Sequence, residues 1–153
     1  MSLPLHSQAP DFALPASDGR MISLEKDFQG KPVILYFYPK DFTPGCTKEA
    51  CSFRDNFQQF HDLEVDILGI SKDSVERHQQ FKATHTLPFE LLADVDGAVC
   101  AKYKALIPLV KLPKRITYLL DAAHKIVGIY NNMFNAAEHV SQMLSETKAR
   151  FSK

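Results

Sequence analysis

An unbroken apolar run, Val33-Ile-Leu-Tyr-Phe-Tyr38, is the feature that most limits the folds open to this chain. A run of this length without polar alternation is typical of a strand that is buried on both faces, as in sheets covered by helices. We therefore predict a central strand over 33–38.

The segments after this strand alternate between helical and extended patterns. Apolar residues recur at helical spacing from Thr43 to about Leu63, which predicts one long amphipathic helix. Further patterns predict the following elements: a strand at 65–70, a helix at 74–84 entered through an Asp73-Ser74 cap, a short strand at 91–93, a short helix at 96–103, an antiparallel hairpin of 116–120 and 125–130, and a helix at 135–150. A βαβ start with a ββα end is the order of a thioredoxin-like α/β fold, in which a central mixed sheet carries helices on both faces.

Composition limits the class of protein. The 153 residues suit one domain, 1–153, and 18 basic residues balance 18 acidic ones, so no net field favours nucleic acid or an anionic membrane as a partner. The N-terminus lacks the pattern of a signal peptide, and the chain has no apolar run long enough to cross a membrane, so a soluble, cytoplasmic protein is expected. In a reducing compartment, two close cysteines indicate catalysis or metal binding more than a structural disulfide.

The chemistry concentrates in the segment PKDFTPGCTKEAC, which joins the central strand to the long helix. The carboxyl end of such a strand is where α/β folds usually place their sites. Thr43 suits the N-cap and Pro44 the first helical position, which puts Cys46 in the first turn. Free N–H groups and the positive end of the helix dipole favour a negative sulfur there.

Pro39-x-x-x-Thr43-x-x-Cys46 resembles the active-site motif of the peroxiredoxins, and the longer string YFYPKDFTPGCTKEACSFRD resembles their bacterioferritin-comigratory protein or PrxQ subfamily. The resemblance implies a peroxidase in which Cys46 attacks the peroxide, Thr43 and a distant arginine bind it, and Pro39 shields the reaction. Arg115, which opens the predicted strand 116–120, fits the position of that arginine. Glu49, three residues after Cys46, is the candidate to orient its guanidinium through a bidentate pair.

Ionisation of Cys46 explains only part of such reactivity. An ordinary thiol is about 3% thiolate at pH 7, so complete ionisation raises the reactive fraction by roughly thirtyfold. Fixed donors must hold the peroxide and stabilise the leaving oxygen. The local candidates are the Thr43 hydroxyl and the N–H groups of Gly45 and Cys46.

Cys51 is the candidate for the resolving cysteine that the resemblance implies. Members of the subfamily that carry this residue in the next helix place it about 35 residues after the peroxidatic cysteine, where this chain reads Gln80-Phe81-Lys82-Ala83. Helical positions five apart lie roughly 8 to 9 Å apart at Cα, whereas a disulfide needs less than about 7 Å. A Cys46–Cys51 disulfide would therefore require the start of the helix to unwind.

The resemblance also implies the rest of the cycle. The enzyme would reduce hydrogen peroxide and organic hydroperoxides to water and alcohols, as a monomer, without a metal or organic cofactor. Thioredoxin would reduce its disulfide, with glutaredoxin as the alternative reductant. Within the chain, Cys100 lies in an apolar stretch and is expected in the core. The six histidines, none paired at ligand spacing, are expected at the surface.

Two other classes of function remain open at this level. A copper-binding protein of the same fold would use Cys46, Cys51 and a histidine of the later hairpin, such as His124, although its cysteines are usually separated by three residues rather than four. A general dithiol oxidoreductase or holdase is disfavoured because Cys-x-x-Cys is absent. The apolar segment 105–113 before Arg115 is a further candidate for contact with bulky peroxides or with the reductant.

Overall fold

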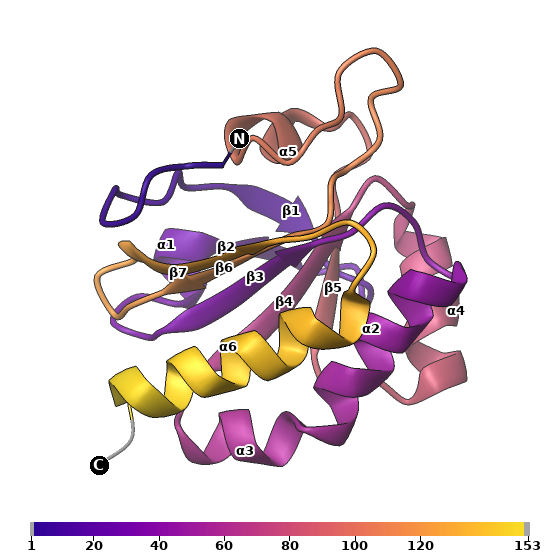
Figure 1. Ribbon diagram of the computed structural model, residues 1–153. Coiled ribbons are helices and arrows are strands. Elements are labelled where there is room, and N and C mark those ends of the chain that lie inside the picture. Colours follow the sequence, from indigo (N-terminus) through magenta and orange to yellow (C-terminus); the bar gives the residue numbers. More distant parts are fainter. Residues whose placement is uncertain (1, 152–153) are drawn as a thin grey trace.

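A five-stranded mixed sheet lies at the centre of the computed structural model, which describes residues 2–151 (Figure 1). The strands are β3 (Val33–Phe37), β4 (Asp66–Ser71), β5 (Glu90–Ala93), β6 (Ile116–Leu120) and β7 (Ile126–Asn131), in the spatial order β5-β4-β3-β6-β7. Strand β3 pairs in parallel with β4 and antiparallel with β6. The prediction of a thioredoxin-like α/β fold with a central β3 is confirmed.

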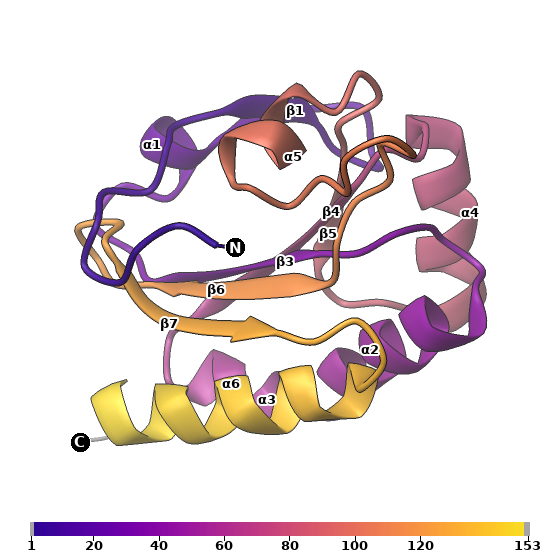
Figure 2. The same ribbon diagram turned by 45° about the horizontal axis from the view of Figure 1, so that its top comes forward.

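Helices cover both faces of the sheet, as predicted. Figure 2 shows α2, α3 and α6 on one side and β1, α1 and α5 on the other. The helices are α1 (Leu24–Asp27), α2 (Pro44–Asp55), α3 (Phe57–Asp62), α4 (Val75–His85), α5 (Ala98–Lys102) and α6 (Ala136–Phe151). Among residues 2–151, no helix has the length and apolar character that a membrane crossing would need.

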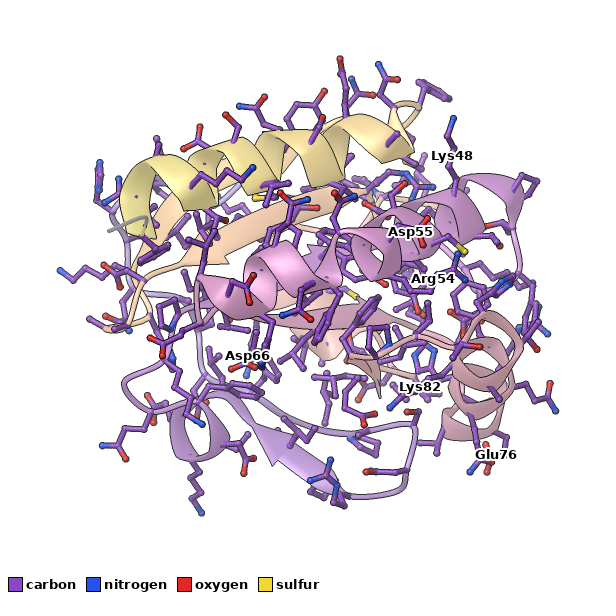
Figure 3. The ribbon with its side chains drawn as sticks, turned by 90° about the horizontal axis from the view of Figure 1, so that it is seen from below. Lys48, Arg54, Asp55, Asp66, Glu76 and Lys82 are labelled. Carbon is purple, nitrogen blue, oxygen red and sulfur yellow. The ribbon has the colours of Figure 1, made fainter. Side chains whose placement is uncertain are left out.

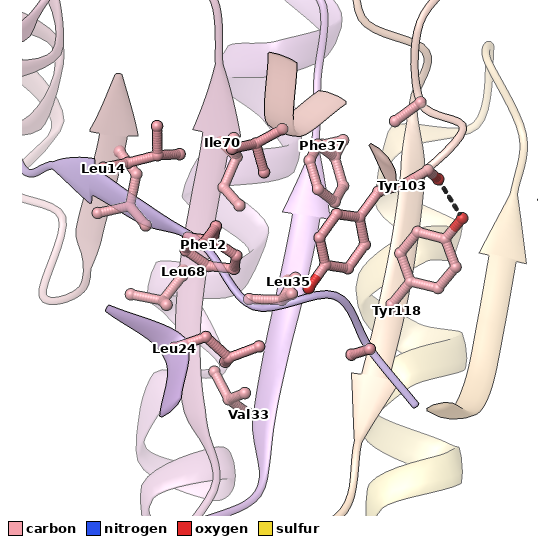
Figure 4. Close-up of a cluster of buried hydrophobic side chains, with 14 of the residues drawn as sticks. Phe12, Leu14, Leu24, Val33, Leu35, Phe37, Leu68, Ile70, Tyr103 and Tyr118 are labelled. Carbon is pink, nitrogen blue, oxygen red and sulfur yellow. Dashed lines mark hydrogen bonds between the residues drawn. The ribbon is translucent and has the colours of Figure 1, made fainter. Parts of the chain in front are cut away.

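Alternate residues of β3 supply two separate cores, because successive side chains of a strand point to opposite faces. Val33, Leu35 and Phe37 pack with Tyr103 and Tyr118 on one face, where Tyr118 Oη donates to Tyr103 O over 2.6 Å (Figure 4). On the other face, a second cluster joins β3 to α2, α4 and α6 through Ile34, Tyr36, Phe53, Phe81 and Met143. All five residues of β3 are buried, in agreement with its unbroken apolar run.

The long helix predicted from Thr43 to Leu63 is wrong in one respect, since it is two helices. Asn56 ends α2 and precedes α3 with φ −106° and ψ 7°, outside the helical range. Its side-chain Nδ2 donates to Ser52 O over 2.8 Å, and its Oδ1 accepts from Gln59 Nε2 over 3.0 Å. An asparagine that bonds to nearby groups in this way competes with regular helical bonding.

The segment before β3 contains a small hairpin that the sequence patterns did not predict. Strands β1 (Ala13–Pro15) and β2 (Met21–Ser23) pair antiparallel and have only three residues each. Together with Phe12 and Leu24, this hairpin covers the Leu35 face of the sheet. Runs of three residues are too short for an alternating pattern to be detected.

Candidate active site at the start of α2

Chain topology brings Arg115 to the start of α2. Strand β3 ends at Phe37, which pairs with Ile116 at the beginning of the antiparallel β6. The residue before Ile116 therefore arrives at the carboxyl end of β3, from which the chain continues through the loop 38–43 into α2. Helix α2 begins at Pro44 after the extended residue Thr43, as predicted, so Cys46 lies in its first turn.

A buried guanidinium connects the predicted residues. Arg115 Nη2 lies 3.4 Å from Cys46 Sγ as a hydrogen-bond donor, and Nη1 donates to Glu49 Oε1 over 2.6 Å. Nε donates to the backbone oxygen of Met133, over 3.1 Å. The three contacts use the three different nitrogens of one planar group, so the N–H donor directed at the sulfur has a fixed orientation. Cys46, Glu49 and Arg115 are all buried.

Burial and charge act in opposite directions on the Glu49–Arg115 pair. Burial raises the pKa of Glu49 to about 8, against the attraction of Arg115, which lowers it. Burial lowers the pKa of Arg115, but Glu49 and Cys46 raise it by more, and the net shift is upward. The guanidinium therefore keeps its positive charge beside the sulfur.

His139 of α6 lies behind Glu49. Its Nε2 bonds to the backbone oxygen of Asn132 over 2.6 Å, and because a carbonyl oxygen only accepts, this nitrogen carries the proton. The other nitrogen, Nδ1, then accepts from Thr117 Oγ1 over 2.8 Å and lies 3.6 Å from Glu49 Oε2. That carboxylate oxygen is buried without a hydrogen-bond partner. Burial lowers the pKa of His139 to about 4.

Thr43 is the N-cap residue by position but does not cap α2 with its side chain. Its hydroxyl donates to Lys40 O over 2.7 Å, within the loop that precedes the helix. The hydroxyl lone pairs and the N–H groups of the first turn are therefore not used in a capping bond. Pro39 is half-buried in the same loop.

Buried polar groups anchor this loop to the neighbouring elements. Asp41 Oδ1 accepts from Tyr38 Oη over 2.5 Å, and Asp41 Oδ2 lies 2.6 Å from His78 Nδ1. The backbone N–H of Asp41 donates to Asp73 Oδ2 over 2.8 Å, and His78 Nε2 bonds to Leu92 O over 3.0 Å. The loop that leads to Cys46 is thus tied to β3, to α4 and to the end of β5.

Cys51 lies half-buried on the side of α2 that faces α4. Its sulfur is 3.8 Å from His85 Nδ1, and Arg54 of the same helix donates from Nη1 to the backbone oxygen of His85 over 2.8 Å. Figure 3 shows Arg54 between these two helices. All three cysteines are free thiols in this structure.

The third cysteine is in the core, as expected from its apolar neighbours. Cys100 is fully buried in α5, and burial raises the pKa of its thiol. By contrast, the tip of the apolar segment 105–113 is exposed, with Leu109 at 98% relative accessibility. The structure thus places the tip of this segment at the surface and buries its two ends, Ala105 and Pro113.

The expectation that all histidines lie at the surface is wrong for His78, His124 and His139, which are buried. Each buried ring has a backbone oxygen as a hydrogen-bond partner: His124 Nε2, for example, bonds to Phe28 O over 2.8 Å. Helical spacing could have found the other two. His139 shares a face of α6 with Val140 and Met143, and His78 lies three residues before the core residue Phe81.

Within residues 2–151, one group of side chains has a spacing that would suit a metal ion, Asp41, Asp73 and His78, and it contains neither Cys46 nor Cys51. Its members already bond to other protein groups: His78 to the Asp41 carboxylate and to Leu92 O, and Asp73 to the backbone N–H of Asp41. His124, the histidine that a copper site would need, bonds to Phe28 O and Lys31 O instead. The geometry does not favour a metal-binding function.

Comparison with known proteins agrees with the fold and with the thiol motif. Residues 5–129 match the AhpC/TSA family. The putative peroxiredoxin bcp of Coxiella burnetii (strain RSA 493 / Nine Mile phase I) is 48% identical over 136 residues, which cover 85% of this chain and 89% of that protein. The chloroplastic peroxiredoxin Q of Oryza sativa subsp. japonica is 44% identical over 139 residues, 90% of this chain but only 64% of that protein.

Among solved structures, the peroxidoxin BcpB of Mycobacterium tuberculosis superposes with a TM-score of 0.90 at 32% identity, over 97% of this chain and 98% of that one. The family match over residues 5–129 includes the segment that carries Cys46, and the superposition covers 97% of the chain. The chain therefore belongs to the AhpC/TSA family, in the branch of the bcp and peroxiredoxin Q proteins, and is a thiol-dependent peroxidase.

Proposed function

We propose that Cys46 is the residue that attacks the hydroperoxide and that Arg115 is its main electrostatic partner. The observation that carries this proposal is the 3.4 Å contact between Arg115 Nη2 and the Cys46 sulfur, made by a guanidinium that Glu49 and Met133 O hold in place. A positive group with a fixed direction stabilises the thiolate, and it can also stabilise the charge that moves onto the leaving oxygen.

The reaction balances as a two-electron transfer. The Cys46 thiolate attacks the terminal oxygen of ROOH, the O–O bond breaks, and the sulfur becomes a sulfenic acid. The leaving alkoxide or hydroxide takes a proton and departs as an alcohol or water. Hydrogen peroxide and organic hydroperoxides undergo the same step, because only the terminal oxygen is transferred.

Groups at the start of α2 would bind the peroxide. The N–H groups of Gly45 and Cys46 point out of the first turn of the helix and are suited to a negative or polarised oxygen. The Thr43 hydroxyl donates to Lys40 O, so its lone pairs remain available to the O–H of a peroxide. Pro39, in the same loop, would limit the access of water.

We propose that Cys51 resolves the sulfenic acid by forming a disulfide with Cys46. Cys46 is buried and Cys51 half-buried on the same continuous helix, so the first turn of α2 has to unwind for the sulfurs to meet. The end that contains Gly45 is the cheapest part to unwind, because helix ends open at the least cost in free energy.

An external dithiol protein then returns the enzyme to its reduced form. Thioredoxin is the proposed reductant, with glutaredoxin as the alternative, since a thiol reductant is general to the family. Both cysteines of the cycle belong to one chain, so a monomer suffices for it. Three free cysteines, two of them buried, suit a reducing compartment, and we propose the cytoplasm.

Mapping of disulfides by mass spectrometry tests the proposal. After one equivalent of peroxide, the wild-type protein should contain a Cys46–Cys51 link and an alkylatable Cys100. Cys46→Ser should abolish peroxide reduction, whereas Cys51→Ser should keep the first oxidation and lose turnover with thioredoxin. A link that includes Cys100, or full steady-state activity of Cys51→Ser, would refute the assignment of the resolving cysteine.

A further inference from the structure

We infer that His85 is a catalytic residue of the resolving step, acting as the proton acceptor for the Cys51 thiol. This inference rests on the proposed role of Cys51. Nothing in the motif around Cys46 indicates it, because His85 lies at the end of another helix, 34 residues after Cys51.

The contact lets the thiol donate to the imidazole when the ring proton of His85 is on Nε2. Cys51 Sγ lies 3.8 Å from His85 Nδ1, within the range of hydrogen bonds that involve sulfur. The ring is held from both sides: Phe81 meets it edge to face with centroids 5.0 Å apart, and Phe42 lies at 6.4 Å. With its ring direction fixed in this way, His85 presents one nitrogen to the sulfur.

Arg54 contributes a positive charge to the same place. It is bound to the backbone oxygen of His85 over 2.8 Å. Its pKa is raised, first by the hydrogen bond to Asp55 and then by Coulombic attraction to Cys51. A thiolate formed at Cys51 would thus have a cation beside it as well as an acceptor for its proton.

The resolving step needs such an acceptor more than the first step does. Cys46 has Arg115 and the start of the helix to favour its thiolate, whereas Cys51 lies in the second half of α2, away from the positive end of the dipole. An ordinary thiol is only about 3% ionised at pH 7. A base in contact with Cys51 would therefore raise the reactive fraction by up to about thirtyfold.

The contact between Cys51 and His85 is also compatible with the unwinding of the first turn of α2. Phe53 is fully buried and Arg54 is bound to α4, so the second half of the helix is anchored. The first turn is held by the hydrogen bond from Arg115 to Cys46 Sγ, which comes from the start of β6 and not from α4. When it opens, Cys46 would move toward a Cys51 that stays beside His85.

His85 Nδ1 takes the proton of the Cys51 thiol, and the thiolate attacks the sulfur of the Cys46 sulfenic acid. The S–S bond forms as the S–O bond breaks, and the hydroxide that leaves combines with a proton as water. When a reductant thiolate later attacks the Cys46 sulfur, Cys51 leaves as a thiolate and can take a proton back from His85.

The test compares two substitutions of the same residue with a matched control. His85→Ala removes the ring, and His85→Phe keeps an aromatic ring against Phe81 and Phe42 but has no nitrogen. Both keep the bond from Arg54, which goes to the backbone. His61→Ala is the control, since His61 is also packed on a phenylalanine, Phe57, with centroids 5.9 Å apart, but is on α3.

Quenched-flow alkylation and mass spectrometry would measure two rates separately, the oxidation of Cys46 and the closure of the disulfide. Both His85 variants should oxidise Cys46 at the wild-type rate, within about twofold, and close the disulfide roughly tenfold more slowly. Added imidazole should restore closure in His85→Ala, where the ring has left space for it. His61→Ala should behave as wild type with and without imidazole.

Wild-type closure in His85→Phe, or slow closure in His85→Ala that imidazole does not accelerate, would overturn the inference and leave His85 a packing residue. Failure of the proposed function gives a different result: the wild-type protein itself would form no Cys46–Cys51 disulfide. Each hypothesis thus has its own refuting outcome.

Discussion

Arg115 Nη2 donates to the sulfur of Cys46 over 3.4 Å, although the two residues are 69 positions apart in the chain. The same guanidinium is bound to Glu49, one turn after Cys46 on α2. One buried cation therefore connects the start of β6 to the start of α2. The reactivity of Cys46 should depend on this connection more than on its helix position alone.

Arg115→Lys should slow the oxidation of Cys46 by about 10- to 100-fold, because an ammonium keeps the charge but cannot bond to Glu49, Met133 O and the sulfur with one rigid group. The second-order rate with hydrogen peroxide measures this effect. Arg115→Ala is a poorer test, since it leaves Glu49 as an unpaired buried acid and should cost roughly 3 to 5 kcal/mol of stability. An unchanged rate in a folded Arg115→Lys protein would contradict the proposed role.

Gly45→Ala should slow the same oxidation by about tenfold while leaving the protein folded. A Cβ at position 45 would lie 3.0 Å from Arg115 Nη2, tighter than ordinary contacts, and Arg115 is held too firmly to move away without losing a bond. Alanine has a higher helix propensity than glycine, by up to about 1 kcal/mol, so the stability of the folded protein should not fall much. Lys48→Ala, an exposed change on the same helix, is the control and should have the wild-type rate. A Gly45→Ala enzyme as fast as the control would show that the guanidinium position is not critical.

His139 should make the free energy of unfolding decrease at acidic pH. Its pKa is lowered to about 4 by burial, from an ordinary value of 6.5. Between these two values the unfolded chain binds a proton at this position and the folded chain does not, so stability is lost as the pH falls from 6.5 to 4. The full loss would be about 3 kcal/mol.

His139→Gln should remove this contribution, so its stability relative to wild type should improve as the pH falls. Urea unfolding at several pH values measures the difference. Glu49 acts in the opposite sense, because its raised pKa makes the folded chain the better proton binder between 4.5 and about 8, and stability falls there as pH rises. For this reason the difference between variant and wild type is the informative quantity. His61→Gln, at an exposed position, is the control for replacing a histidine by glutamine.

Asp41 should need its hydrogen-bonding capacity more than its charge. Asp41→Leu would leave Tyr38 Oη and His78 Nδ1 without their partner, at about 1 to 3 kcal/mol for each buried group. Asp41→Asn can still accept from Tyr38 with its amide oxygen and donate to His78 Nδ1 with its amide nitrogen, so it should lose much less. Thermal unfolding of the two variants compares these costs. Equal loss in both would indicate that the Asp41–His78 contact is an ion pair whose charge is essential.

Several parts of the fold follow from local patterns. The run from Val33 to Phe37 predicted a strand buried on both faces, and its alternate side chains do supply both cores. Ser74 accepts from Arg77 N as the cap of α4, as the Asp73-Ser74 pair predicted. The break at Asn56 was missed because the spacing of Phe53, Phe57 and Phe60 continues across it.

The sequence by itself determined that Cys46 lies in the first turn of a helix at the end of a central strand, since Thr-Pro-Gly-Cys and the apolar run before it are local signals. Only the tertiary structure decided which groups surround that sulfur. Arg115 reaches it because β6 runs antiparallel to β3, and His85 reaches Cys51 because α4 packs beside α2. Contacts between distant segments depend on strand order and helix packing, which no local pattern encodes. For that reason the position of Cys46 could be predicted from its neighbours in the chain, whereas its neighbours in space could not.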